Sequence, residues 1–180
     1  ERISTSGNDY KKIKEYIVKD YRDLFPISPE KSKGWCTNPR ILSFDIETYS
    51  DNHYAMPDRE NPDHVIFMIS CLYQVTNDIS TRKKYVILTE KCKEIPDAEL
   101  IYAEDEEDLL IKFQDLIDIL DPEIILGYNI YGYDYPYIES RFKQYRKDYE
   151  PCSRYIGKIP TMYASEWASG AYGKTTIFYL

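Results

Sequence analysis

Apolar and polar residues alternate along Ile41–Glu47, and this alternation predicts a β-strand with two chemically different faces. One face carries Leu42, Phe44 and Ile46, which we expect to enter the hydrophobic core. The other face carries Ile41, Ser43, Asp45 and Glu47. The carboxylates of Asp45 and Glu47 should therefore project from the same side of the strand.

Three further segments downstream are predicted to be strands. Val65–Tyr73 and Lys84–Leu88 are predicted strands, and Asn77-Asp78 between them has turn chemistry. A short fourth strand is expected at Leu100–Ala103. The polar segment Tyr49–His64 contains two prolines and is predicted to be a loop.

The pattern then changes to helical periodicity. Asp105 is the expected N-cap of a helix whose apolar stripe runs to Leu120, and Asp121-Pro122 should end it. The unbroken apolar run Ile124–Leu126 is predicted to form a central parallel strand covered on both faces. A second helix is expected over Asp134–Tyr145. Strands followed by alternating helices and strands predict an α/β fold with a mixed sheet flanked by helices.

The two ends of the sequence have patterns of their own. Tyr10–Tyr21 has the spacing of an amphipathic helix, and prolines and a glycine then interrupt regular structure. We therefore interpret residues 1–39 as a lead-in segment that packs on another domain, and residues 40–180 as the main domain. Thr175–Leu180 has the composition of one more strand, and the sequence stops inside it.

Composition narrows the class of protein. The chain has 180 residues and a net charge of −8, which argues against gripping duplex DNA mainly by neutralising its phosphates. Bound divalent cations could still supply positive charge locally. No apolar run approaches the roughly 18 residues needed to cross a bilayer, and no secretion signal is present, so we expect an intracellular protein without a membrane partner. Four cysteines without a C-x-x-C pair, and only two histidines, disfavour structural zinc.

The pair Asp45 and Glu47 is the first candidate for chemistry. Two carboxylates on one strand face repel each other unless a cation holds both. An all-oxygen site of this kind suits a hard cation such as Mg²⁺ or Mn²⁺. The same pattern is also typical of a strand that simply runs out into solvent, so the pair alone does not decide between the two.

The second candidate is Gly127–Asp134, between the apolar run and the second predicted helix. Ligands of α/β sheets bind at the carboxyl ends of central strands. Asp134 is equally compatible with an ordinary helix N-cap, and Asn129 with an ordinary turn residue. The segment and the start of the helix are crowded with tyrosines. We interpret most of them as packing residues, with one or two able to stack on unpaired bases.

Taken together, the two candidates resemble the exonuclease motifs of family B DNA polymerases. Phe44–Thr48 is similar to the first motif, and Asp121–Ile130 with Tyr133–Ile138 is similar to the second, in the form found in eukaryotic DNA polymerase delta and in polymerases of large DNA viruses. The resemblance extends from about residue 40 to about residue 141. The family usually has Phe where this chain has Tyr133, which should keep the aromatic packing if its hydroxyl finds a partner.

The resemblance implies a ribonuclease H-like domain of the DEDD exonuclease type that proofreads DNA in the 3′→5′ direction. It implies two divalent cations, Mg²⁺ or Mn²⁺, with Asp45, Glu47 and Asp134 as catalytic metal ligands. Asp45 would bridge both cations, Glu47 would hold the one that activates water, and Asp134 the one beside the leaving 3′-oxygen. Thr48 and Asn129 match positions that contact the DNA strand.

The family's third motif supplies a Tyr and a final Asp, and nothing after Asp134 matches it, so we expect the sequence to be an incomplete domain. The expected partners are a single-stranded 3′ primer end, the rest of a polymerase chain and a possible processivity factor. The expected location is the nucleus or a cytoplasmic viral replication site. Two alternatives stay open: a stand-alone DEDD-type exonuclease acting on RNA or DNA, and a non-catalytic ribonuclease H-like module for architecture or docking.

Overall fold

The computed structural model describes residues 17–52, 54–146, 163–169 and 173–179. The chain divides into two compact units. The first comprises Glu1–Thr37 with Ser153–Ile159, and the second comprises Asn38–Cys152 with Pro160–Leu180. The two units are described separately below. The boundary expected between residues 39 and 40 stays a prediction.

The described part of the first unit contains two short helical turns, η1 (Tyr21–Asp23) and α1 (Pro29–Ser32). The helix predicted over residues 10–21 lies mostly outside the described residues, and the prediction is wrong for residues 17–20, which are not helical. Ile17 is 59% exposed and Tyr21 is 81% exposed. Without a packed apolar face, a short helix is only marginally stable. Instead, the Asp20 carboxylate accepts a hydrogen bond from the Arg22 N–H at 2.9 Å and begins a 3-10 turn.

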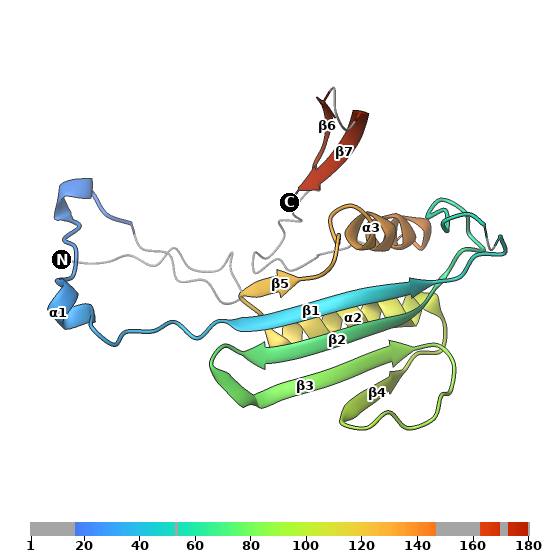
Figure 1. Cartoon of the computed structure of the whole chain (residues 1–180), viewed down its shortest axis with the longest axis horizontal. Helices are drawn as coiled ribbons and strands as arrows, with labels where there is room; N and C mark the ends of the chain where they lie inside the picture. The colour runs from blue at the N-terminus through green and yellow to red at the C-terminus, as the bar shows by residue number, and fades with distance from the viewer. Residues whose placement is uncertain (1–16, 53, 147–162, 170–172, 180) are drawn as a thin grey trace. The chain divides into compact units, whose positions relative to one another are not determined.

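A mixed sheet of five strands forms the centre of the second unit (Figure 1). Its strand order is β4-β3-β2-β1-β5. The first three strands form an antiparallel meander, while β4 is parallel to β3 and β5 is parallel to β1. The strands are β1 (Arg40–Thr48), β2 (Ile66–Val75), β3 (Asp78–Leu88), β4 (Ala98–Tyr102) and β5 (Ile124–Leu126). The mixed sheet and all five predicted strand segments within it are therefore confirmed.

The register of the sheet gives its two faces different characters. Phe44 pairs with Cys71 of β2, and both side chains are buried. One residue further on, Asp45 pairs with Ser70 and is exposed. The alternation predicted for β1 is thus confirmed, with Leu42, Phe44 and Ile46 in the core and Asp45 and Glu47 on the open face.

Helix α2 (Glu106–Leu120) lies behind β1 and β2 in Figure 1. It begins as predicted, because the Asp105 carboxylate accepts a hydrogen bond from the Asp108 N–H at 2.9 Å. It ends at Asp121, which adopts a left-handed conformation with φ of 47°. The stripe that α2 buries in the core consists of Leu109, Leu110, Phe113, Leu116 and Ile117.

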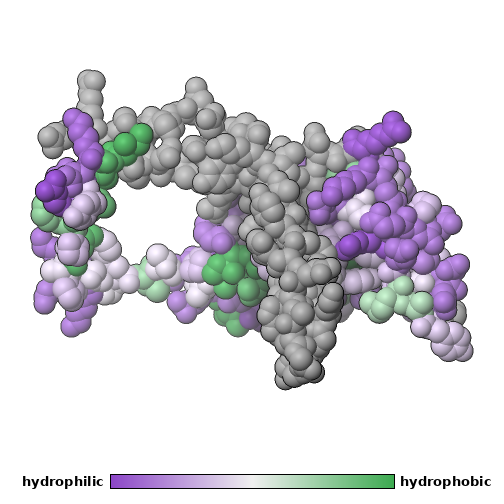
Figure 2. All heavy atoms as spheres, turned by 90° about the horizontal axis from the view of Figure 1, so that it is seen from above, coloured by the Kyte–Doolittle hydropathy of each residue, from purple (hydrophilic) through white to green (hydrophobic). Residues whose placement is uncertain are grey.

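Helix α3 (Asp134–Gln144) packs against the same core as α2. The Phe44 ring of β1 lies 5.0 Å from the Phe113 ring of α2 and 5.3 Å from the Tyr135 ring of α3, measured between centroids. One strand residue therefore joins both helices to the sheet. Seen from above, the end of the second unit that holds α3 and the loop after β1 presents mainly hydrophilic side chains (Figure 2).

The prediction of a covered central strand at residues 124–126 is wrong. Within the described sheet β5 is an edge strand, and Ile124 and Leu126 are 39% and 47% exposed. Its position is set instead by hydrogen bonds between Glu123, the residue that precedes it, and Arg40, the first residue of β1. The Arg40 N–H donates to the Glu123 carboxylate at 2.6 Å, and the Glu123 N–H donates to the Arg40 carbonyl at 2.9 Å. These bonds hold the start of β5 against the start of β1.

A separate two-stranded antiparallel sheet is formed by β6 (Tyr163–Ser169) and β7 (Gly173–Tyr179). The strand predicted at residues 175–180 is confirmed as far as Tyr179. Among the helices that the structure describes, none has both the length and the apolar character needed to cross a membrane.

Candidate exonuclease site

The two sequence motifs meet where β1 continues past the end of β5. The pairing of these strands ends at Ser43 and Leu126, so β5 does not cover the next residues of β1. Beyond this point, Asp134, the first residue of α3, lies at the edge of β1 that β5 leaves uncovered. Its Oδ1 accepts a hydrogen bond from the backbone N–H of Ile46 at 3.1 Å, and the residue is only 2% exposed. The N-cap of α3 is Tyr133, so the N-cap interpretation of Asp134 is wrong.

A glycine makes this close approach possible. A Cβ atom on Gly127, which directly follows β5, would lie 1.9 Å from Cγ2 of Ile130 and 2.8 Å from the carbonyl oxygen of Phe44. Both distances are far below ordinary van der Waals contact. Only glycine therefore allows the chain to leave β5 against the backbone of β1 and reach the start of α3.

The surroundings of Asp134 disfavour its negative charge. Burial raises the pKa of this carboxyl, and the charges of Asp45 and Glu47 raise it further, so that it reaches about 6 although the Ile46 N–H lowers it. The charges of Asp45 and Glu47 therefore act on Asp134, and we refer to these three carboxylates as the acidic cluster. A bound cation would relieve this repulsion.

The carboxylates of the acidic cluster have the ligand chemistry of a hard-cation site, but they are not already arranged around one metal position. All three side chains offer carboxylate oxygens, which Mg²⁺ and Mn²⁺ prefer. However, within the part of the chain that the structure describes, no group of three or more His, Cys, Asp or Glu residues is already arranged to hold a metal ion. Asp45 and Glu47 are exposed on β1, whereas Asp134 is buried beside it.

Asp45 also borders a hollow of about 620 Å³ on the open face of the sheet. The hollow is lined by both polar and apolar side chains, among them Ser70 and Lys84 from the neighbouring strands and Tyr128 from the turn after β5. The Asp45 carboxylate is thus accessible from the face of the sheet that α2 and α3 do not cover.

Thr48 ends β1 beside this cluster and is hydrogen-bonded to the second motif. Its Oγ1 lies 2.8 Å from the hydroxyl oxygen of Tyr133, and both residues are half-buried. The Tyr133 hydroxyl therefore has a hydrogen-bond partner, which is the condition we set for Tyr to replace the family's usual Phe. Burial raises the pKa of Tyr133; the bond to Thr48 lowers it, and the nearby charges of Asp134 and Glu47 raise it again.

Asn129 shapes the turn that leads into α3. It adopts a left-handed conformation with φ of 54°, and its carbonyl accepts hydrogen bonds from the N–H groups of Gly132 at 2.9 Å and Tyr133 at 3.0 Å. Asn is one of the few residues that tolerates this conformation. The turn interpretation is confirmed, and a contact between Asn129 and DNA stays a prediction.

Apart from the half-buried Tyr133, the tyrosines in and next to the second motif fall into two groups. Tyr135 and Tyr137 are buried in the core, as the packing interpretation predicts. By contrast, Tyr128 is 93% exposed and Tyr131 is 43% exposed. Tyr128 and Tyr131 therefore have exposed rings, and stacking of either on an unpaired base stays a prediction.

Sequence reasoning missed a buried ion pair next to the site. Glu106 directly follows Asp105, the expected N-cap of α2, yet its side chain is buried against Arg141 of α3, with an Nε–Oε1 distance of 2.9 Å. The same carboxylate accepts hydrogen bonds from the Ile66 N–H at 2.6 Å and the Tyr145 hydroxyl at 2.6 Å. The available signal was an arginine three residues after buried Ile138, on the apolar side of a helix.

The loop between β1 and β2 is tied to α3 by polar contacts. Arg141 donates to the carbonyl of Asn61 at 2.9 Å, and the Tyr137 hydroxyl donates to the carbonyl of His64 at 2.7 Å. Ser140 bonds to the side chain of Glu60 at 2.9 Å. These contacts place α3, and therefore Asp134, relative to both strands that the loop connects.

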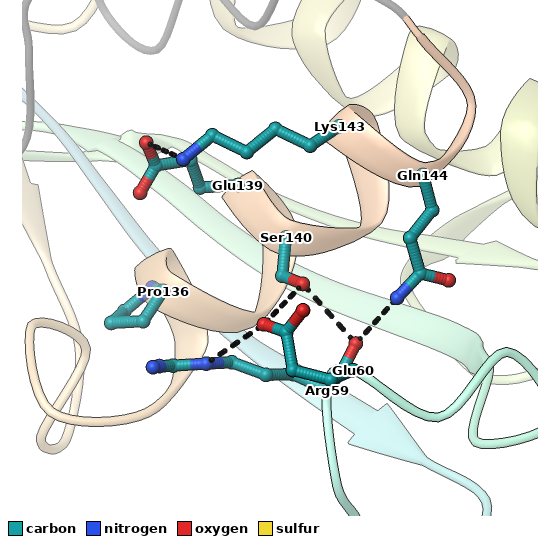
Figure 3. A pocket seen from close by; sticks show the side chains of 7 residues that line it. All are labelled: Arg59, Glu60, Pro136, Glu139, Ser140, Lys143 and Gln144. Atoms are coloured by element: carbon teal, nitrogen blue, oxygen red, sulfur yellow. Dashed lines mark hydrogen bonds and ion pairs between the residues drawn. The ribbon is translucent and has the colours of Figure 1, made fainter.

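Figure 3 shows a second hollow, of about 470 Å³, where this loop meets α3. Its charged side chains pair with one another: Lys143 lies 2.8 Å from Glu139, and Arg59 lies 3.7 Å from Glu60. The four charges cancel, so we assign no anion-binding role to this hollow. It is lined by Arg59, Glu60, Pro136, Glu139, Ser140, Lys143 and Gln144.

Comparison with known proteins identifies the family. The family model described as DNA polymerase family B, exonuclease domain, matches residues 3–178. Because this match covers nearly the whole sequence, the chain belongs to that family, and the resemblance noted in the two motifs is confirmed. Its mixed sheet with flanking helices is the ribonuclease H-like fold of such exonuclease domains, which are metal-dependent nucleases.

Curated relatives are DNA polymerases of viruses and eukaryotes. DNA polymerase 120R of Invertebrate iridescent virus 3 is 34% identical over 105 residues, covering 57% of this chain and 9% of that polymerase. The DNA polymerase delta catalytic subunit of Plasmodium falciparum is 34% identical over 121 residues, covering 67% and 11%. The DNA polymerase catalytic subunit of Murid herpesvirus 1 is 35% identical over 144 residues, covering 72% and 13%.

The chain thus spans between 9% and 13% of the length of these relatives. A solved structure of the family B DNA polymerase from the hyperthermophilic archaeon Pyrobaculum calidifontis is 25% identical, with a TM-score of 0.48 over 66% of this chain and 13% of that one.

Proposed function

We propose that this chain provides the 3′→5′ proofreading exonuclease site of a family B DNA polymerase, which hydrolyses the terminal phosphodiester of a single-stranded or frayed DNA 3′ end. The observation that carries the proposal is the bond from the Ile46 N–H to Asp134, because it brings the carboxylate of the second motif to the strand that bears Asp45 and Glu47. The electrostatic effect of both residues on the pKa of Asp134 supports the same grouping.

Asp45, Glu47 and Asp134 would hold two divalent cations, Mg²⁺ or Mn²⁺. When bound, such ions supply an activated water and stabilise the departing 3′-oxygen. The protein's own contribution is placement. The Ile46 N–H fixes Asp134, and the pleat of β1 keeps Asp45 and Glu47 on one face, open to an incoming strand. Repulsion within the acidic cluster makes cation binding favourable.

Thr48 and Asn129 would contact the DNA strand beside the cluster. A hydroxyl and an amide are suitable partners for phosphate, sugar and base edges. Thr48 adjoins Glu47 at the end of β1, and Asn129 lies in the turn that leads to Asp134. An unpaired strand is the expected substrate, because a mismatched end frays at low energetic cost and only a free terminus reaches the carboxylates.

The length of the relatives favours a polymerase over a stand-alone exonuclease, since each has the match within a much longer chain. A larger polymerase chain and a processivity factor are therefore the proposed protein partners. The proposed location is wherever that polymerase replicates DNA, in the nucleus or at a cytoplasmic viral replication site. A purely architectural role would not explain why Asp134 is buried beside the strand that carries Asp45 and Glu47.

The test is hydrolysis of a 5′-labelled single-stranded oligonucleotide by the full natural chain that contains this sequence. We expect shortening from the 3′ end only with Mg²⁺ or Mn²⁺, and loss of at least about 100-fold in Asp45→Ala with polymerisation retained. Glu90→Ala, which removes an exposed carboxylate outside the acidic cluster, is the matched control and should leave the rate unchanged. Undiminished hydrolysis by Asp45→Ala would refute the assignment.

A further inference from the structure

A side-chain hydrogen bond connects the last residue of β1 to the residue that precedes α3. It joins Oγ1 of Thr48 to the hydroxyl of Tyr133 over 2.8 Å. Thr48 directly follows Glu47, and Tyr133 directly precedes Asp134. The bond therefore lies beside the acidic cluster and links the two segments that carry it.

The phenol of Tyr133 is held in place from several sides. Its ring centroid lies 5.5 Å from that of Tyr137, which is buried and anchored through its own hydroxyl to the carbonyl of His64. The backbone N–H of Tyr133 donates to the carbonyl of Asn129 at 3.0 Å. Tyr133 is thus a fixed partner for Thr48 rather than a mobile surface side chain.

The direction of the bond determines what Thr48 can offer. Either hydroxyl can donate over this distance. Because a phenol is more acidic than an aliphatic alcohol and is the better donor, we infer that Tyr133 donates and Thr48 accepts. A threonine hydroxyl that accepts one bond keeps its own hydrogen for another acceptor. Beside a site for a DNA 3′ end, the acceptor that arrives is a non-bridging phosphate oxygen.

We propose that Tyr133 is a positioning residue for the DNA strand, which fixes the Thr48 hydroxyl so that it donates to a phosphate near the 3′ end. This inference rests on the proposed function, since it takes Thr48 as a contact of the strand. It adds a hydroxyl that acts through Thr48 and does not itself touch the reacting atoms. Tyr133 therefore affects the affinity for the DNA strand and not the rate of the chemical step.

The test combines binding and hydrolysis in the full natural chain. Binding is the dissociation constant of a fluorescent single-stranded oligonucleotide with unmodified linkages, measured by anisotropy in Ca²⁺, with which the proposed function predicts no hydrolysis. Tyr133→Phe removes only the oxygen, Thr48→Ala removes the hydroxyl it orients, and Thr48→Ser keeps that hydroxyl. Tyr102→Phe in β4 is the matched control. The double variant Tyr133→Phe/Thr48→Ala tests whether both residues act through one contact.

We expect Tyr133→Phe and Thr48→Ala each to weaken binding by roughly three- to ten-fold, the range of one ordinary hydrogen bond. The double variant should be no weaker than the worse single variant, while Thr48→Ser and Tyr102→Phe should bind within about two-fold of wild type. In hydrolysis, KM should rise and kcat should stay within about two-fold. A purely structural bond would lower thermal stability without this shared loss of binding.

Two results would overturn the inference: unchanged binding by Tyr133→Phe, or losses that multiply in the double variant. A wild-type chain that binds no single strand overturns it together with the proposed function. A third result would overturn the hydrolytic function alone. The wild-type chain would bind the single strand without hydrolysing it, while the variants showed the expected changes in binding.

Discussion

The backbone N–H of Ile46 donates to the Asp134 carboxylate over 3.1 Å, although 88 positions separate these residues in the sequence. This bond is possible because β5 stops pairing with β1 at Ser43 and leaves the edge of β1 open. It places a buried carboxylate beside the strand whose open face carries Asp45 and Glu47. The geometry of the whole site depends on this junction between strand edge and helix start.

The raised pKa of Asp134 predicts how stability depends on pH. The pKa rises from its ordinary value of 3.8 to about 6 on folding, so the folded chain binds the proton more tightly than the unfolded chain. Stability should therefore fall as pH rises from about 4 to about 6 and stay lower above that. Asp134→Asn, which cannot ionise, should raise the free energy of unfolding at pH 7.5 by on the order of 2 kcal/mol without divalent cations.

Chemical denaturation in EDTA at several pH values measures this effect. The advantage of Asp134→Asn should shrink towards zero as the pH falls below 3.8, where the wild-type carboxyl becomes protonated in the unfolded as well as the folded state. A variant that is less stable than wild type at pH 7.5 would show that ionised Asp134 is stabilised by its surroundings, contrary to the direction of its pKa shift.

The buried pair of Glu106 and Arg141 predicts a large stability loss when one partner is removed. Arg141→Met should lower the free energy of unfolding by about 3–5 kcal/mol, because it leaves the Glu106 carboxylate buried without its counter-charge. Lys143→Met on the same helix removes a half-exposed pair with Glu139 and is the matched control, with an expected change of at most about 0.5 kcal/mol. Denaturant titration compares the two, and equal losses would contradict a special role for the buried pair.

The turn after β5 predicts that Gly127 cannot be replaced. In Gly127→Ala the new methyl group must displace Ile130 and the β1 backbone at Phe44, which should cost about 1–3 kcal/mol of stability. Because the same turn delivers Asp134 to Ile46, the hydrolysis rate should fall by more than the fraction of unfolded protein explains. Thermal melting together with exonuclease assays tests this, and wild-type values in both would show that the turn has room for a side chain.

Part of this architecture could be predicted because it follows from local periodicity. The alternation along β1 was sufficient to separate core residues such as Phe44 from Asp45 and Glu47, since a strand repeats every two residues. The capping of α2 by Asp105 was likewise a local signal. Both predictions concern residues whose neighbours in space are also neighbours in sequence.

The rest depends on contacts that a local pattern does not encode. The apolar run of β5 shows hydrophobicity but not how many strands flank it, so its edge position in the described sheet was missed. The helix start at Glu106 is acidic like many others, and its burial is a consequence of Arg141 arriving from α3. Asp134 looked like an N-cap because the unpaired edge of β1 that it satisfies lies in the other motif.

The account's central claim is that Asp45, Glu47 and Asp134 together hold divalent cations. The most direct measurement is anomalous diffraction from crystals of the full natural chain soaked in Mn²⁺ at about 10 mM, a concentration that should fill even a weak carboxylate site. The account predicts an anomalous peak within coordination distance of Asp45 and Asp134 that disappears in Asp45→Ala. A map with no peak at these carboxylates, while Mn²⁺ is bound elsewhere in the same crystal, would contradict it.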